Sequence, residues 1–197
     1  MGRPRVFVSP TLPRDRVEHE WLDQLRVGDP LAFESVFRAY YSPLCAFAHS
    51  YVRCHETSEE IVQDLFCWIW DRRFTLEMPH GMRLWLFTAV RNRSLNALRD
   101  RRLELSTHER FSLDARSQPP AAPPDADLSA EELSAAAART VALMPPRCRE
   151  AFTLIRLQHM SYAEAAHVMG ISSRTVEVHM TRAIASLRAA LAAWVTP

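Results

Sequence analysis

Glycine is scarce in this sequence, and its cysteines and histidines form no recognisable motif. Four of the 197 residues are glycine, too few for the glycine-rich loops that cradle phosphates in nucleotide-binding enzymes. Four cysteines (Cys45, Cys54, Cys67 and Cys148) show neither a CxxC pair nor a Cys/His spacing typical of zinc sites. The eight histidines form no HExxH motif, and a nucleophile elbow is also missing. We therefore expect reduced thiols, no metal, no cofactor and no enzymatic activity.

Long apolar runs are also missing. No stretch approaches the roughly 18 to 20 uninterrupted apolar residues that a membrane span needs. Residues 1–13 contain arginine but lack an apolar core of signal-peptide length. These two absences predict a cytoplasmic protein with no direct membrane insertion.

Lysine does not occur, and the net charge is nearly zero. All 24 cationic side chains are arginine, and 23 acidic ones bring the net charge to +1. Such a balance argues against a protein that coats nucleic acid by bulk electrostatics. The distribution is nevertheless uneven, because arginine dominates residues 81–103 and acidic residues dominate residues 104–130. This asymmetry requires a functional explanation.

Apolar residues recur at the period of an α-helix over long stretches. Together with the scarcity of glycine, this pattern predicts an all-α protein. The first strongly periodic segment covers residues 31–52, and the next is expected to begin with Ser58 as its N-cap. Residues 75–81 are predicted to form a loop, and residues 82–103 a third long helix.

A proline-rich segment divides the chain. Residues 117–127 contain four prolines among Ala, Ser and Asp, a composition typical of a stiff, extended linker. We therefore predict two small helical domains joined by a Pro/Ala-rich linker. The four expected parts are a mobile N-terminal arm (1–20), a helical domain (21–103), an acidic linker (104–130) and a second helical domain (131–197).

The most specific local signal lies in residues 161–176. Ser161 and Glu164 have the spacing of a capping box, which begins a helix. Gly170 stands where that helix would end in a left-handed residue. Ser172 can then cap a second helix after a three-residue turn. This succession predicts a helix-turn-helix motif.

The second helix of this motif has a polar face suited to DNA. Its predicted buried residues are Val176, Met180, Ile184, Leu187 and Leu191. The predicted DNA-facing residues are Ser172, Ser173, Arg174, Thr175, Glu177, Val178, Thr181 and Arg182. In such motifs the start of the second helix enters the major groove, where Arg pairs with guanine and Glu accepts from cytosine. A helical hairpin with a solvated face is the plainer alternative.

The basic helix over residues 82–103 also has two distinct sides. Its predicted buried side consists of Leu84, Phe87, Val90, Ser94 and Leu98. The opposite side carries Trp85, Thr88, Asn92, Asn96 and Arg99. An aromatic ring among amides and arginine suits stacking on an unpaired base. Taken alone, this helix slightly favours the alternative, in which the Trp covers a domain edge beside a solvated end.

These segments, in this order and spacing, resemble the sigma-70 family, specifically the extracytoplasmic-function (ECF, group IV) sigma factors of bacterial RNA polymerase. Residues 29–33 resemble conserved region 2.1, and residues 58–70 resemble region 2.2. Residues 85–99 resemble the regions that melt and read the −10 element, and residues 143–176 resemble region 4.

The resemblance implies a transcription initiation factor that gives core RNA polymerase its promoter preference. It implies that the five polar-side residues of the 82–103 helix contact the −10 element and that the helix-turn-helix residues contact the −35 element. It also implies that the linker threads the RNA channel and that an anti-sigma factor, often membrane-linked, holds the protein. The residues that the resemblance assigns to polymerase binding are Glu60, Gln63, Asp64 and Phe66.

A stand-alone helix-turn-helix regulator is the alternative function. It would use the same motif to bind DNA, with residues 25–103 as a sensor domain. Such a sensor needs a ligand pocket, whereas the sequence predicts a helical bundle there. Transcription from promoter DNA with added core polymerase distinguishes the two functions.

Overall fold

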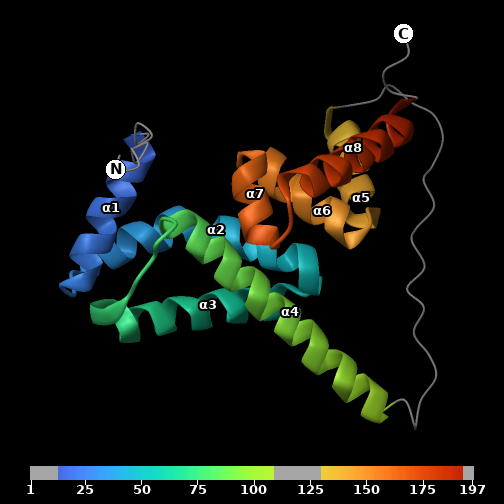
Figure 1. Cartoon of the computed structure of the whole chain (residues 1–197). Helices are drawn as coiled ribbons and strands as arrows, with labels where there is room; N and C mark the ends of the chain where they lie inside the picture. The colour runs from blue at the N-terminus through green and yellow to red at the C-terminus, as the bar shows by residue number, and fades with distance from the viewer. Residues whose placement is uncertain (1–12, 109–129, 193–197) are drawn as a thin grey trace, which may run out of the picture.

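The computed structural model describes residues 13–108 and 130–192, and its elements in these ranges are all helical (Figure 1). The elements are α1 (Pro13–Arg26), α2 (Pro30–Val52), α3 (His55–Arg72), the 3-10 turn η1 (Arg73–Thr75), α4 (Met82–His108), α5 (Ala130–Leu143), α6 (Pro146–Phe152), the π-helical turn η2 (Thr153–Leu157), α7 (Tyr162–Met169) and α8 (Ser173–Ala190). The predicted all-α class is confirmed. Among the described residues, no helix is both long and apolar enough to cross a bilayer.

The start of α2 follows directly from its local sequence. Gly28 adopts a φ of +86° in the turn after α1, a left-handed conformation that glycine reaches without strain. The Asp29 side chain then accepts a hydrogen bond from the Leu31 backbone N–H at 2.9 Å. Pro30 occupies the first turn, where its missing N–H has no partner to lose.

The structure corrects two predictions in the N-terminal part. The expected mobile arm over residues 1–20 overlaps α1, which begins at Pro13 and buries Glu18 and Leu22. Ser58 is not an N-cap, because α3 begins three residues earlier, after Cys54. Ser58 instead lies buried inside the helix, where its hydroxyl donates to the Cys54 carbonyl. The residue type alone does not distinguish a Ser at the N-cap from a Ser one turn inside the helix, so the sequence placed the start of α3 too late.

The helix from Met82 also runs further than predicted. It ends at His108 and not near residue 103, so the first residues of the expected linker are helical. The proline-rich segment of that linker, residues 117–127, lies outside the described residues. The C-terminal half of α4 projects from the body of the molecule (Figure 1).

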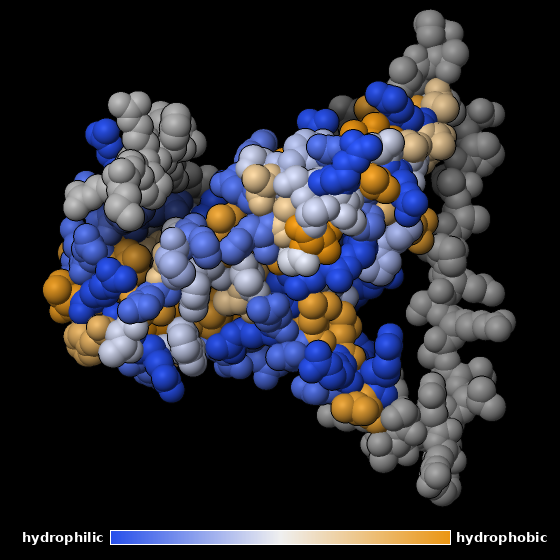
Figure 2. All heavy atoms as spheres, in the orientation of Figure 1, coloured by the Kyte–Doolittle hydropathy of each residue, from blue (hydrophilic) through white to orange (hydrophobic). Residues whose placement is uncertain are grey.

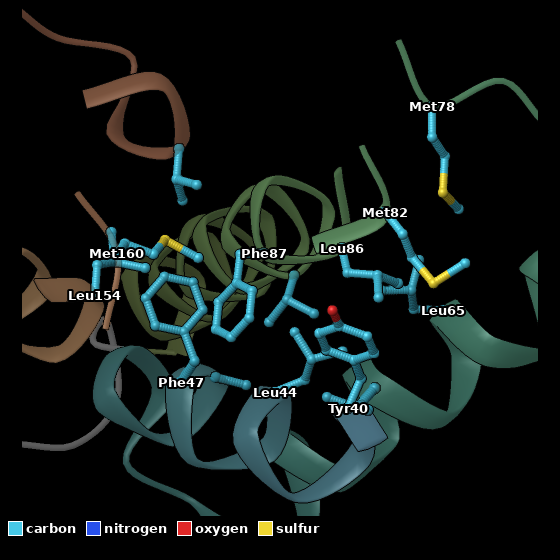
Figure 3. Packing of buried hydrophobic residues seen from close by; sticks show 14 of the residues in the cluster. Tyr40, Leu44, Phe47, Leu65, Met78, Met82, Leu86, Phe87, Leu154 and Met160 are labelled. Atoms are coloured by element: carbon cyan, nitrogen blue, oxygen red, sulfur yellow. The ribbon is translucent and has the colours of Figure 1, made fainter. Parts of the chain in front are cut away.

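The core of the N-terminal half lies between α2, α3 and α4. Tyr40, Leu44 and Phe47 follow one another along α2 at helical spacing and point at Leu65 of α3 and Phe87 of α4 (Figure 3). Each of these five side chains is at most 1% exposed. Hydrophilic residues cover most of the face shown in Figure 2, as expected when the apolar ones turn inward.

The C-terminal half is organised around α8, which packs against α5, α6 and α7. Val176 and Met180 are buried as predicted. Ile184, Leu187 and Leu191 are only half-buried, although Ile184 and Leu187 still pack against buried residues.

The two halves share one apolar core in this structure. Helix α7 packs against α4, and α6 packs against α2. Leu154 and Met160 from the C-terminal half belong to the same buried cluster as Phe47 and lie beside it (Figure 3). The N-terminal half of α4 is therefore packed among α2, α3 and α7.

Candidate nucleic-acid interface

The helix-turn-helix is held by three local devices. The Ser161 hydroxyl accepts from the Glu164 N–H at 3.2 Å, while the Glu164 carboxylate accepts from the Ser161 N–H at 2.7 Å. Gly170 ends α7 with a φ of 65°. The Ser172 hydroxyl accepts from the Thr175 N–H at 3.1 Å and caps α8. The predicted capping box, left-handed glycine and second cap are all confirmed.

The predicted DNA-facing residues of α8 are all exposed. They are Ser172, Ser173, Arg174, Thr175, Glu177, Val178, Thr181 and Arg182. Val176 and Met180 are buried on the opposite side, so the helical phase inferred from apolar spacing is correct. The contacts of these eight side chains with DNA stay a prediction.

Two of these side chains form a weak pair. An Arg174 guanidinium nitrogen lies 3.7 Å from the Glu177 carboxylate, with side chains 89% and 53% exposed. Exposed pairs of this kind contribute little to stability. Breaking this pair so that both side chains can contact base edges would therefore cost little free energy.

On α4, the predicted base-contacting residues divide into two groups. Trp85, Thr88 and Asn92 line a cavity of about 230 Å³. Asn96 and Arg99 lie further along the helix, where both are exposed and outside that cavity. The Thr88 hydroxyl oxygen is buried and has no hydrogen-bond partner among the described residues.

Three aromatic residues near this cavity were not predicted. The Trp68 ring on α3 stacks on Trp85, with centroids 5.8 Å apart and an interplanar angle of 25°. His80, in the loop before α4, lines the cavity together with His167 of α7, and their ring centroids are 4.4 Å apart. No sequence signal identifies these residues, because each reaches the cavity through contacts between separate elements.

The face predicted to bind polymerase is only partly available. Glu60, Gln63 and Asp64 are exposed on α3. Phe66 is 2% exposed and packs edge-on against Phe37, with centroids 4.9 Å apart. Its assignment to a binding surface is wrong for this structure, because the ring fills the core and presents no surface to a partner.

A buried ion pair joins the two halves of the molecule. The Arg91 guanidinium on α4 donates to the Glu150 carboxylate on α6 at 2.6 Å, with side chains 11% and 3% exposed. Arg147 contacts the other carboxylate oxygen at 3.1 Å. Burial, together with the nearby Glu150 charge, raises the pKa of the Tyr51 hydroxyl above its usual range. No group of His, Cys, Asp and Glu in the described ranges is arranged to hold a metal ion.

Comparison with protein families gives two matches. The model described as "Sigma-70 region 2" matches residues 36–104. The model described as "Sigma-70, region 4" matches residues 134–187. The first match includes most of α4, and the second includes the helix-turn-helix.

Individual proteins agree with these matches. The chain is 26% identical over 174 residues to "ECF RNA polymerase sigma factor SigM" of Mycobacterium tuberculosis, covering 88% of this chain and 84% of that protein. It is also 26% identical to "Probable RNA polymerase sigma factor RfaY" of Xanthomonas campestris pv. campestris, but spans only 44% of that relative's length. A solved structure of the sigma factor RpoE with the anti-sigma factor NepR from Bartonella quintana is 26% identical. It superposes with a TM-score of 0.61 over 81% of this chain and 96% of that one.

Proposed function

This chain belongs to the sigma-70 family, and we propose that it acts as an ECF-type sigma factor that directs core RNA polymerase to promoters. The observation that carries this proposal is the pair of matches to region 2 and region 4, in that order, on a chain with an exposed recognition helix. In this function the polymerase performs the chemistry and this chain contributes recognition. Its place of action is the cytoplasm, where the polymerase meets the chromosome.

We place the contact with core polymerase on the exposed face of α3. Glu60, Gln63 and Asp64 support this assignment, because they present two carboxylates and an amide. A surface of this kind suits a basic partner. Phe66 supports the site from beneath by fixing α3 against Phe33 and Phe37.

The −10 element is assigned to the cavity side of α4. Trp85 offers a ring for base stacking, and its stack on Trp68 holds that ring in position. Thr88 and Asn92 supply hydroxyl and amide groups beside it. Asn96 and Arg99 extend the polar surface along the helix, where they can hold the DNA backbone.

The −35 element is assigned to the start of α8. Arg174 and Glu177 lie in its first turns, the part of a recognition helix that reaches base edges. Arg182 lies two turns further on, where the helix drifts toward the phosphates. Base contacts carry sequence information, whereas phosphate contacts fix only position.

Two further partners belong to the proposal. The acidic linker (104–130) would lie in the channel for nascent RNA, which is built to hold a polyanion. An anti-sigma factor would hold the free protein, as NepR accompanies RpoE in the related structure. The stand-alone regulator is less well supported, because the sensor domain that it requires coincides with the region 2 match.

The deciding experiment is transcription with purified core polymerase on a library of promoter fragments. We expect discrete transcripts that need both proteins, with a shared −35 and −10 pattern upstream. Arg174→Ala should weaken binding by about 1–3 kcal/mol and relax preference at one or two −35 positions. Arg182→Ala should weaken all promoters alike and lower the salt slope by about one unit. Sequence-specific binding without polymerase, and no transcript with it, would support the regulator instead.

A further inference from the structure

A groove lies where the two halves of the chain meet, away from both proposed DNA-binding faces. It has a volume of about 340 Å³, within the range of small-molecule sites. Residues from α2, α5, α6 and η2 line it. Its walls are largely apolar, with small side chains such as Ala46, Ala138 and Val141 and the exposed Leu157 at the rim.

Two guanidinium groups converge in this groove. Arg53, at the end of α2, donates to the Ala142 carbonyl at 2.8 Å. Arg149, on α6, donates to the same oxygen at 2.7 Å. Arg149 is only 7% exposed, so it forms part of the floor, whereas Arg53 is exposed at the edge.

In the part of the chain that the structure describes, these two charges have no counter-ion. Among the described residues, no carboxylate lies within salt-bridge distance of Arg53 or Arg149. The Ala142 carbonyl, in the last turn of α5, supplies a favourable partial charge. One shared carbonyl uses one of the five N–H donors of each guanidinium. Burial, and then the neighbouring Arg53, lower the pKa of Arg149.

An apolar groove with a few convergent polar groups has the composition of a small-molecule site. Two adjacent guanidinium groups favour an oxyanion, which can accept hydrogen bonds from both. Thr153 adds a hydroxyl group, whereas the Ser50 hydroxyl already donates to the Phe47 carbonyl at 2.7 Å. The alanines leave room for an aliphatic body. The volume of about 340 Å³ favours a small molecule over a partner helix as the occupant.

We propose that this groove binds a small amphipathic organic anion, with its carboxylate or phosphate head at Arg53 and Arg149 and its apolar tail along α5. Such a ligand would contact α2 of the region 2 half and α5 and α6 of the region 4 half simultaneously. It would therefore stabilise the packing of the two halves against each other. The inference does not depend on the proposed promoter recognition and can be tested without polymerase.

The test is calorimetric titration of the full chain with octanoate, octyl phosphate and neutral octanol. We expect saturable one-to-one binding of at least one of the two anions and none of octanol. A preference between the anions identifies the head group. Arg53→Asn should weaken binding about tenfold, because it removes a charged donor. Asn also tolerates the left-handed backbone of Arg53, whose φ is 55°.

Two matched variants distinguish binding in the groove from non-specific attraction of the anion to arginine side chains. Arg38→Gln removes an exposed arginine of the same helix, outside the groove, and should leave binding unchanged. Ala138→Phe keeps every charge and fills the groove, so it should abolish binding. Ala138 is exposed, so this change should not unfold the protein, which circular dichroism will show. No saturable binding of either anion, equal binding of octanol, or undiminished binding to Arg53→Asn or Ala138→Phe would each overturn the proposal.

Discussion

At the scale of single residues, contacts of short range along the chain fix both ends of α7. Ser161, Glu164 and Gly170 take their predicted roles because the groups that they satisfy lie within four residues along the chain. Phe66 shows the limit of this reasoning. Periodicity places it on the apolar side of a helix, but only the positions of Phe33 and Phe37 decide that it packs inside.

Gly170 provides a direct test of backbone conformation. Its φ is +65°, and a Cβ added there would meet nothing within 4 Å. The cost of Gly170→Ala therefore comes from the backbone alone and should be about 1–2 kcal/mol. Gly170→Asn should cost less, because Asn adopts the left-handed region more readily. Urea unfolding of both variants measures the difference, and equal losses would contradict this account.

The cysteines should differ in reactivity. Burial raises the pKa of the Cys148 thiol above its usual range, while Arg182 partly opposes the shift. Cys67 is exposed. We expect iodoacetamide to alkylate Cys67 much faster than Cys148 at neutral pH, as read by mass spectrometry of peptides.

The same shift has a consequence for stability. A raised pKa means that folding favours the neutral thiol, so this stabilisation is complete below the unfolded pKa of Cys148. It is lost as the pH rises through the folded value. Cys148→Ala should remove this contribution to the loss of folding stability at alkaline pH, whereas Cys67→Ala should leave the contribution in place.

At the scale of whole elements, the sequence predicts a helix best where one side alone is buried. Helix α8 meets this condition, and its exposed side was predicted correctly. Helix α4 is covered by α2, α3 and α7, so its apolar residues lie on several sides. Phe87 and Val90 are buried as predicted, but Leu84 is half-buried and Leu86, which was not predicted, is fully buried.

The ion pair between α4 and α6 should be worth far more than a surface pair. Glu150 is 2% exposed and neutralises Arg91 inside the protein. Glu150→Ala would leave that arginine buried and unpaired, which typically costs about 3–5 kcal/mol. Glu34→Ala breaks an equally short but exposed pair with Arg38 and should cost at most about 1 kcal/mol. Chemical denaturation of both variants compares them, and similar losses would show that burial is unimportant here.

The tryptophan stack between α3 and α4 should matter in promoter opening. If Trp85 stacks on an unpaired base, Trp85→Ala loses about 1–3 kcal/mol of that contact. The defect should disappear on a promoter with a pre-melted bubble. Trp68→Ala should produce a smaller defect of the same kind, because Trp68 holds the Trp85 ring. An unchanged opening rate for Trp85→Ala would return this residue to a purely structural role.

At the scale of the molecule, the arrangement of the two halves could not be predicted. Composition indicates where a linker separates them, but their contact depends on side chains from distant segments, such as Arg91 with Glu150 and His80 with His167. This contact has a consequence for the proposed function. Helix α4 has 27 residues and α8 has 18, which correspond to about 40 and 27 Å. The centres of a −35 and a −10 element lie about 85 Å apart on B-form DNA, at 3.4 Å per base pair.

Even placed end to end, the two helices fall short of that separation, so the α7–α8 unit must leave α4 before both elements are read together. The His80 and His167 rings, 4.4 Å apart, allow this to be tested. In a His80→Cys/His167→Cys variant with Cys67→Ser, a short, cleavable thiol cross-linker should hold the two halves together. We expect the cross-linked protein to lose promoter-specific transcription with core polymerase and to recover it when the linker is cleaved. Each single-cysteine variant, treated in the same way, should transcribe equally before and after the linker is cleaved. Undiminished transcription by the cross-linked protein would mean that the halves read a promoter without separating.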